Sequence, residues 1–146
     1  MTIQLIKDAL ASNTFSMSSY EQMYRDFHQN PELSNQEEQT AATIAKFLTS
    51  LGDFEIHEHI GGHGLAAVLK NGSGKTVLLR ADMDALPVEE QTGLDYASIK
   101  KMKDQFGVEK SVMHACGHDF HMTALLAGNF TCQSQSRIIV AHMSSI

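Results

Sequence analysis

The stretch from Met113 to His121, Met-His-Ala-Cys-Gly-His-Asp-Phe-His, constrains this chain more than any other. It contains three of the eight histidines, one of the two cysteines and an aspartate. Thiolate sulfur, imidazole nitrogen and carboxylate oxygen are the atoms with which proteins bind zinc-like cations. Because Cys116 and His118 are two residues apart, an extended backbone would direct both side chains toward one ion. We therefore expect a metal-binding turn at this point of the chain.

A helix is expected to begin directly after this turn. Asp119 has the residue type of an N-cap, whose side-chain oxygen accepts hydrogen bonds from the free amides of the first helical turn. Gly117 lacks a Cβ and leaves room for a tight bend before the helix. The apolar side of the helix would comprise Met122, Leu125, Leu126 and Phe130.

A pair of acidic side chains follows a predicted strand. Val77, Leu78 and Leu79 form a continuous apolar run, which is typical of a strand covered on both faces. Asp82 and Asp84 lie at its carboxyl end, where open α/β sheets gather their ligands. Two carboxylates on one side repel each other, so a cation or strong donors would stabilise them. A plain transition from strand to loop, with solvated aspartates, is the alternative.

Helical patterns occupy the first third of the chain. Capping boxes at Ser18–Glu21 and Ser34–Glu37 predict two helices, with apolar residues recurring every three or four positions after each. Pro31 stops the first helix, and Gly52 fits the left-handed stop of the second. A weaker helical pattern covers residues 3–12.

Strands and loops are expected in the middle of the chain. Alternating or apolar stretches bounded by glycine-rich turns predict strands at residues 54–59, 65–69 and 76–80. Residues 88–112 are predicted to form a long surface loop that carries a basic patch of solvated lysines.

Five further residues invite a functional interpretation. His57, His59 and His63 lie in and after the first predicted strand, but no carboxylate sits among them in a chelating pattern, so a polar strand edge is favoured over a second metal site. Arg25 and His28 lie one helical turn apart, off the apolar stripe of their helix, and are expected on a solvated face.

Composition excludes several classes of protein. With 146 residues, 42% apolar and 19% charged, the chain can form one globular domain. A net charge of −6 argues against a nucleic-acid binder. Two cysteines do not make a disulfide framework, no secretory signal is visible, and no apolar run approaches the ~20 residues of a membrane span. We therefore expect a cytoplasmic protein that binds neither nucleic acid nor membrane.

Three stretches together resemble the metal-dependent amidohydrolase and peptidase family of hippurate hydrolases, N-acyl-L-amino acid amidohydrolases and plant auxin-conjugate hydrolases. These stretches are Arg25–Ser34, Leu79–Pro87 and His114–His121, and the resemblance covers residues 18–128. It implies an α/β fold, namely part of a zinc-peptidase-like catalytic domain with a mixed sheet flanked by helices and without the lid and dimerisation domain.

The resemblance also implies roles for individual residues. Cys116 and His118 look like metal ligands, and Asp84 looks like the catalytic-site carboxylate that orients the site. Asp82 stands where relatives outside this subgroup place a histidine ligand. The family holds two divalent metal ions per site, zinc, manganese or cobalt. The implied reaction is hydrolysis of an amide bond in a small-molecule N-acyl amino acid or peptide, by proteins that are often homo-oligomers.

The chain departs from the family after the last motif. The family's next landmark is a pair of glutamates, one a general base and one a ligand, yet no acidic residue follows Asp119. We expect a truncated chain, with residues 1–128 as the N-terminal part of the catalytic domain and residues 129–146 as an atypical tail not native to the fold. Ile138–Val140 could form a short strand there. The alternatives are an inactive remnant that binds a metal or a partner chain, and a purely structural zinc site.

Overall fold

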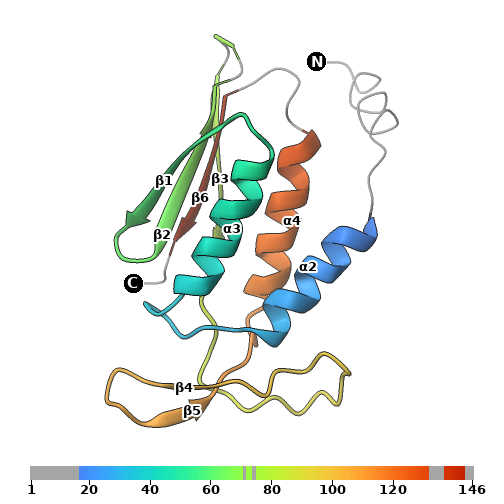
Figure 1. The fold of residues 1–146 in the computed structure, drawn as a ribbon, viewed down its shortest axis with the longest axis vertical. Helices are drawn as coiled ribbons and strands as arrows, with labels where there is room; N and C mark the ends of the chain where they lie inside the picture. The colour runs from blue at the N-terminus through green and yellow to red at the C-terminus, as the bar shows by residue number, and fades with distance from the viewer. Residues whose placement is uncertain (1–16, 71, 74, 132–136, 144–146) are drawn as a thin grey trace.

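The computed structural model describes residues 17–70, 72–73, 75–131 and 137–143, with side chains up to residue 128, so the helical pattern at residues 3–12 lies outside it. The elements are α2 (Met17–Gln29), α3 (Glu38–Ser50), β1 (Phe54–Ile60), β2 (Gly64–Leu69), β3 (Thr76–Asp82), β4 (Lys101–Lys103), β5 (Glu109–Ser111), α4 (His118–Thr131) and β6 (Arg137–Met143). The helices lie on one face of a sheet, and the β4–β5 hairpin lies below them (Figure 1). Within the described residues, no helix has the length and apolar character needed to cross a membrane.

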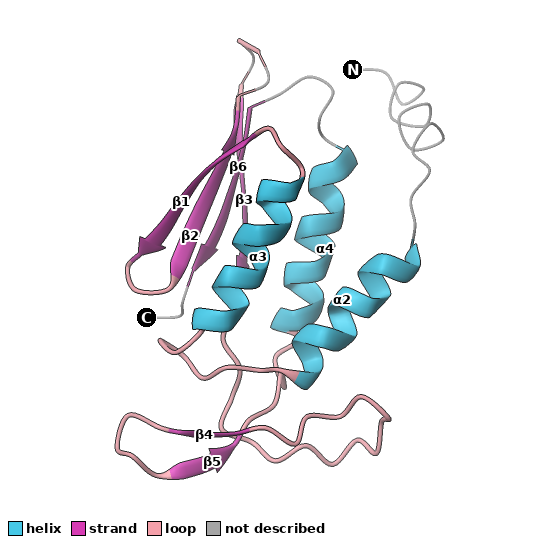
Figure 2. Cartoon of the chain, in the orientation of Figure 1, coloured by secondary structure: helices cyan, strands magenta, loops and turns pink. Residues whose placement is uncertain are grey.

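The sheet is mixed, as the family resemblance implies. Its strand order is β1-β2-β6-β3. The β1–β2 and β2–β6 pairs are antiparallel and the β6–β3 pair is parallel (Figure 2). The first three strands occupy the predicted segments to within two residues. β6 contains the predicted run Ile138–Val140 and lies inside the sheet, while the division of the chain at residue 128 stays a prediction.

β3 is less buried than its apolar run predicts. It forms an edge of the sheet, and Val77 and Leu78 are 44% and 61% exposed. The expectation of a strand covered on both faces is wrong in this structure, because β3 is an edge strand of the described sheet and the described helices cover only one face of that sheet (Figure 1). Leu79, the third residue of the run, is half-buried and packs against the core.

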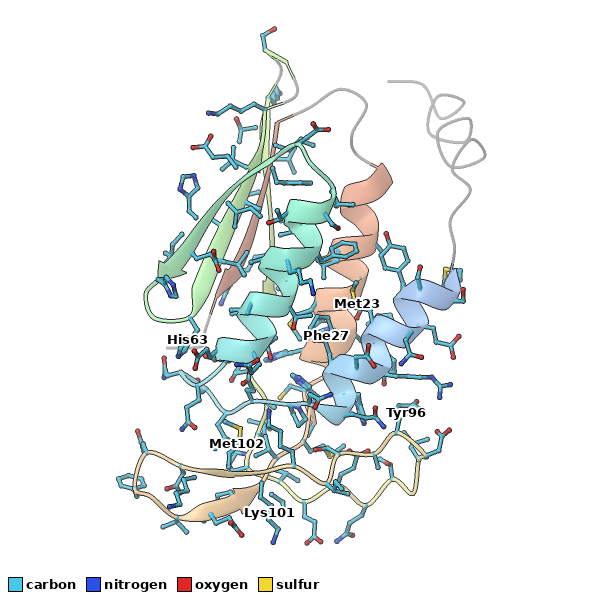
Figure 3. All side chains as sticks on the ribbon, viewed as in Figure 1. Met23, Phe27, His63, Tyr96, Lys101 and Met102 are labelled. Carbon is cyan, nitrogen blue, oxygen red and sulfur yellow. The ribbon has the colours of Figure 1, made fainter. Side chains whose placement is uncertain are left out.

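The main core lies between the sheet and the helices. The side chains from α3 and α4 that expose no surface are Ile44, Leu48, Met122 and Leu126. Met23 and Phe27, labelled in Figure 3, extend this core to α2. Burial of each large side chain contributes roughly 1.5–3 kcal/mol, so these apolar stripes explain why the helices form here. The predicted apolar side of α4 is confirmed at Met122 and Leu126, and the side chain of Phe130 lies outside the described ones.

The two ends of α3 differ in how well they follow the sequence prediction. The helix begins at Glu38, and Glu37 holds the N-cap position without a side-chain capping bond. Glu37 Oε1 accepts the Asn35 N–H at 3.0 Å, and Asn35 has a φ of 64°, so Ser34 precedes a turn and the helix begins later than a cap at Ser34 predicts. Gly52 has a φ of 90° and ends the helix in the predicted left-handed conformation.

The segment between β3 and α4 contains a hairpin that the sequence prediction missed. β4 and β5 pair antiparallel inside the expected surface loop. Val112 is 1% exposed and forms a second small core with Leu33 and Ala85, against which Met102 packs (Figure 3). Lys101 is exposed on the hairpin, as predicted. This small core fixes the chain directly after Asp84.

Candidate metal centre

The histidine-rich stretch forms a turn that leads directly into α4. The Gly117 N–H donates to the His114 carbonyl at 3.4 Å, and Gly117 has a φ of 74°, which glycine adopts without strain. His118 is the first residue of α4. The backbone at Cys116 is therefore a turn, and the extended conformation assumed from the two-residue spacing is wrong.

His118 is held by the chain that follows β3. Its Nδ1 lies 2.8 Å from the backbone oxygen of Asp84 and 3.1 Å from Asp84 Oδ1. Because a carbonyl oxygen only accepts, Nδ1 carries the hydrogen, and Nε2 of the neutral ring keeps its lone pair. Proteins commonly orient metal-binding histidines in this way. The structure thus brings together Asp84 and His118, two of the three site residues expected from the sequence.

The remaining expected residues have different surroundings. Cys116 is a free, exposed cysteine in the turn. Asp82, the last residue of β3, lies with its Oδ1 2.7 Å from Arg80 Nη2, whereas Asp84 contacts His118. Among the residues that the structure describes, no group of three or more histidine, cysteine, aspartate or glutamate side chains is arranged to hold a metal ion.

His114 is a buried residue of the same turn that the sequence analysis did not assign to the site. Its side chain is 4% exposed, and neither ring nitrogen has a hydrogen-bond partner. Burial lowers the pKa of His114 to about 4, although the negative charges of Asp119 and Asp84 act in the opposite direction. Buried nitrogens without a hydrogen-bond partner cost free energy, and a bound metal ion would supply such a partner. The unpaired nitrogens of His114 therefore support the interpretation of this turn as a metal site. The sequence feature that could have identified His114 is its place as the first histidine of the stretch Met113–His121.

His28 is buried, so the predicted solvated face is wrong at this residue. Its Nδ1 lies 2.6 Å from Asp119 Oδ2, and its Nε2 lies 2.9 Å from Glu90 Oε1. Because carboxylates only accept, both ring nitrogens donate and the imidazole is positively charged. Burial lowers the pKa of His28, but the hydrogen bonds to Glu90 and Asp119 outweigh it and raise this pKa above its ordinary value. These partners are 62 and 91 residues away in sequence, which local helical spacing cannot reveal.

Asp119 does not act as the predicted N-cap of α4. It lies inside the first turn, after His118, and is 2% exposed. Its Oδ1 accepts the N–H of Phe120 at 2.8 Å, and its Oδ2 contacts His28. The prediction failed because the helix begins at His118, two residues earlier than an N-cap at Asp119 requires, and the Asp119 carboxylate contacts His28 of α2.

The histidines near β1 lie at the opposite edge of the sheet from β3. His57 is exposed, with its Nε2 3.2 Å from Glu55 Oε1. His59 is exposed at an irregular point of the strand and has a φ of 61°. His63, labelled in Figure 3, is half-buried after the turn. This arrangement agrees with the polar strand edge favoured from the sequence.

The mixed sheet, its covering helices and the histidine-rich turn define part of a zinc-peptidase-like α/β catalytic domain. Residues 78–137 match the model of Peptidase family M20/M25/M40. The chain is 46% identical over 108 residues to hippurate hydrolase of Campylobacter jejuni, covering 73% of this chain and 26% of that protein. It is 43% identical over 124 residues to N-acetyl-L-cysteine deacetylase of Bacillus subtilis, covering 82% and 27% respectively.

Solved structures agree with this assignment. A crystal structure from methicillin-resistant Staphylococcus aureus superposes with a TM-score of 0.78 at 35% identity, covering 99% of this chain and 35% of that one. The Bacillus subtilis YXEP protein, described as a dinuclear metal-binding peptidase from the M20 family, superposes with a TM-score of 0.73 at 31% identity, covering 88% and 35%. The chain is similar to members of peptidase family M20/M25/M40, and it spans about a quarter of the length of the curated relatives it matches.

Proposed function

We propose that this chain carries a metal-binding part of a metal-dependent amidohydrolase, which cleaves an amide bond in N-acyl amino acids or small peptides. One observation carries the proposal: Asp84 fixes Nδ1 of His118 and leaves Nε2 for an ion, two residues after the thiol of Cys116. The names of relatives support the substrate class, among them hippurate hydrolase and the N-acyl-L-amino acid amidohydrolase of Geobacillus stearothermophilus. A cytoplasmic location and homo-oligomeric assembly belong to the same proposal.

Each residue of the turn has a distinct part in this proposal. Cys116, as a thiolate, and Nε2 of His118 would hold a divalent ion, zinc, manganese or cobalt, at a site that in the family takes two ions. Asp84 orients the ring of His118. When bound, such an ion polarises the amide carbonyl and lowers the pKa of a water molecule from ~16 toward ~7. His114 lies in the same turn, and neither of its ring nitrogens has a hydrogen-bond partner.

Hydrolysis of hippurate by the purified 146-residue chain tests the proposal. In zinc or manganese we expect release of glycine, loss of this activity in chelator and its return when metal is restored. The Cys116→Ala chain should be inactive, and a His57→Gln chain, changed at an exposed residue of β1, should match the unmodified chain. Turnover that continues unchanged in chelator refutes the metal dependence.

A second candidate function is metal binding without catalysis. It is favoured by the sequence, because no acidic residue follows Asp119 in this chain and a general base would have to come from elsewhere. Equilibrium dialysis against zinc separates the two functions. The second candidate predicts zinc binding that depends on Cys116, together with hippurate turnover no higher than that of the Cys116→Ala chain.

A further inference from the structure

A buried ion cluster lies next to the metal-binding turn and has no part in the proposed hydrolysis. It consists of His28 and the two carboxylates that it joins, Glu90 and Asp119, and is called the His28 cluster below. We propose that His28 is a positioning residue, which fixes the turn at the start of α4 and so holds the ligand residues Cys116 and His118 in place. The inference rests on the proposed function, which assigns Cys116 and His118 as metal ligands.

His28 is placed to position other groups and not to bind an ion itself. Both of its ring nitrogens are taken, by Asp119 at 2.6 Å and by Glu90 at 2.9 Å, so neither has a lone pair to offer. The His28 side chain is 6% exposed, and those of Glu90 and Asp119 are 0% and 2% exposed. The rings of Tyr24 and Tyr96 pack against the imidazole, with centroids 5.7 and 5.3 Å away, and fix its plane (Figure 3 labels Tyr96).

One arm of the cluster reaches the first turn of α4. Asp119 is the residue after His118, and both of its carboxylate oxygens are occupied, Oδ1 by the Phe120 N–H and Oδ2 by His28. The Asp119 backbone oxygen accepts the Thr123 hydroxyl at 2.8 Å. Asp119 is therefore fixed through side chain and backbone, and the neighbouring His118 is fixed with it.

The other arm reaches the segment that follows Asp84. Glu90 Oε2 accepts the Ser98 N–H at 2.6 Å, and Oε1 accepts the Thr92 hydroxyl as well as the bond from His28. Glu90 thus pins the chain between β3 and the hairpin. Because Asp84 precedes this segment and contacts His118 directly, the His28 cluster braces both sides of the Asp84–His118 contact.

A positive charge is required between these carboxylates. Two buried carboxylates without a cation between them repel each other and lose their charge-assisted hydrogen bonds. Glutamine at position 28 keeps a polar side chain and can donate through its one amide nitrogen, but it has no charge. We therefore expect His28→Gln to release Asp119 and loosen the turn, while the core between the sheet and α3 remains.

Hydrogen exchange of the metal-free chains measures the positioning directly. The reporter amides lie in the first turn of α4, including the His121 N–H, which donates to the Gly117 carbonyl at 3.0 Å. In His28→Gln, exchange in this turn should accelerate about tenfold more than exchange in α3, since local opening differs from global unfolding. Equal acceleration in both helices would mean that His28 only stabilises the whole fold, and it would overturn the proposal.

Cobalt binding measures the consequence for the ligands. The thiolate-to-cobalt absorption band reports coordination by Cys116, and titration of this band gives the affinity. We expect the folded His28→Gln chain to bind Co²⁺ about 10- to 100-fold more weakly than the unmodified chain, with His57→Gln as the matched control that binds normally. An affinity within twofold of the unmodified chain overturns the proposal.

Two further outcomes are decided by the same measurements. If His28→Gln does not fold, Glu90→Gln replaces it. Its amide oxygen can still accept from Ser98, but its amide nitrogen then faces His28, so both the charge and the hydrogen bond from His28 are lost. Its folded chain should bind cobalt at least about threefold more weakly, and unchanged affinity overturns the proposal. If the unmodified chain shows no thiolate–cobalt band, the proposed function fails, and hydrogen exchange still decides whether His28 fixes the turn.

Discussion

Acid should destabilise the metal-free chain through His114. The pKa of this buried imidazole is lowered from 6.5 to about 4 by burial. Near pH 7 His114 is neutral in both the folded and the unfolded chain, so its stabilising contribution is fully present. As the pH falls below 6.5, the unfolded chain takes up a proton that the folded chain refuses, and the free energy of unfolding decreases until the pH reaches about 4.

The size of this loss follows from the difference between the two pKa values. Each pKa unit corresponds to about 1.4 kcal/mol of differential interaction. At pH 5 the histidine is mostly protonated in the unfolded chain and mostly neutral in the folded chain. The part of the pKa difference that lies above pH 5, about 1.5 units, therefore counts toward the loss of stability. Acidification from pH 7 to pH 5 should therefore cost about 2 kcal/mol through His114 alone.

Urea denaturation at pH 7 and pH 5, in the presence of a chelator, measures this quantity. The comparison is between the unmodified chain and His114→Asn, whose side chain does not titrate. Both chains keep His28, whose raised pKa gives stability that is present at low pH and lost as the pH rises, so its contribution cancels. His57→Asn controls for the loss of a histidine elsewhere. If the unmodified chain and His114→Asn lose stability equally between the two pH values, the reasoning about His114 is wrong.

Three other predictions concern the core, the turn and the metal. Leu126→Ala should lower the free energy of unfolding by about 2–5 kcal/mol in urea denaturation, because it leaves a cavity where a fully buried side chain packed. Leu78→Ala, on the exposed edge strand, should change this free energy by less than about 0.5 kcal/mol. Gly117→Ala should cost about 1–2 kcal/mol through its left-handed backbone alone, since no atom lies within 4 Å of the added Cβ; a cost near zero would contradict the turn. Zinc should raise the Tm of the unmodified chain in thermal denaturation, and Cys116→Ala should remove most of that increase, while an equal increase in both chains would exclude the thiol as a ligand.

The helices and the strands β1, β2 and β3 follow from local pattern and for that reason were predictable, whereas the short strands β4 and β5 were missed. The glycine turn between β1 and β2, the alternation of β1 and the left-handed stop at Gly52 all depend on neighbours within a few residues. The exposure of Val77 and Leu78 was not predictable, because it depends on the place of β3 at the edge of the sheet and on which elements cover each face. A strand's own sequence carries no record of that.

The site was only partly predictable. The motif identified Asp84 and His118 as neighbours through the family resemblance, and the structure places them in contact. Spacing alone gave the wrong backbone for Cys116, since the left-handed Gly117 bends the chain where an extended strand was assumed. The burial of His28 depends on carboxylates from two distant segments, so no local pattern could show it.

The open edge at β3 also has a consequence for assembly. The outward N–H and C=O groups of an edge strand can pair with another strand. Exposed apolar residues such as Leu78 favour that association, because pairing would remove them from water. A parallel neighbour added there would finish beside Asp82 and Asp84, because strands running in the same direction end at the same border of a sheet. A parallel strand that pairs with this edge would therefore place the side chains at its carboxyl end near the turn.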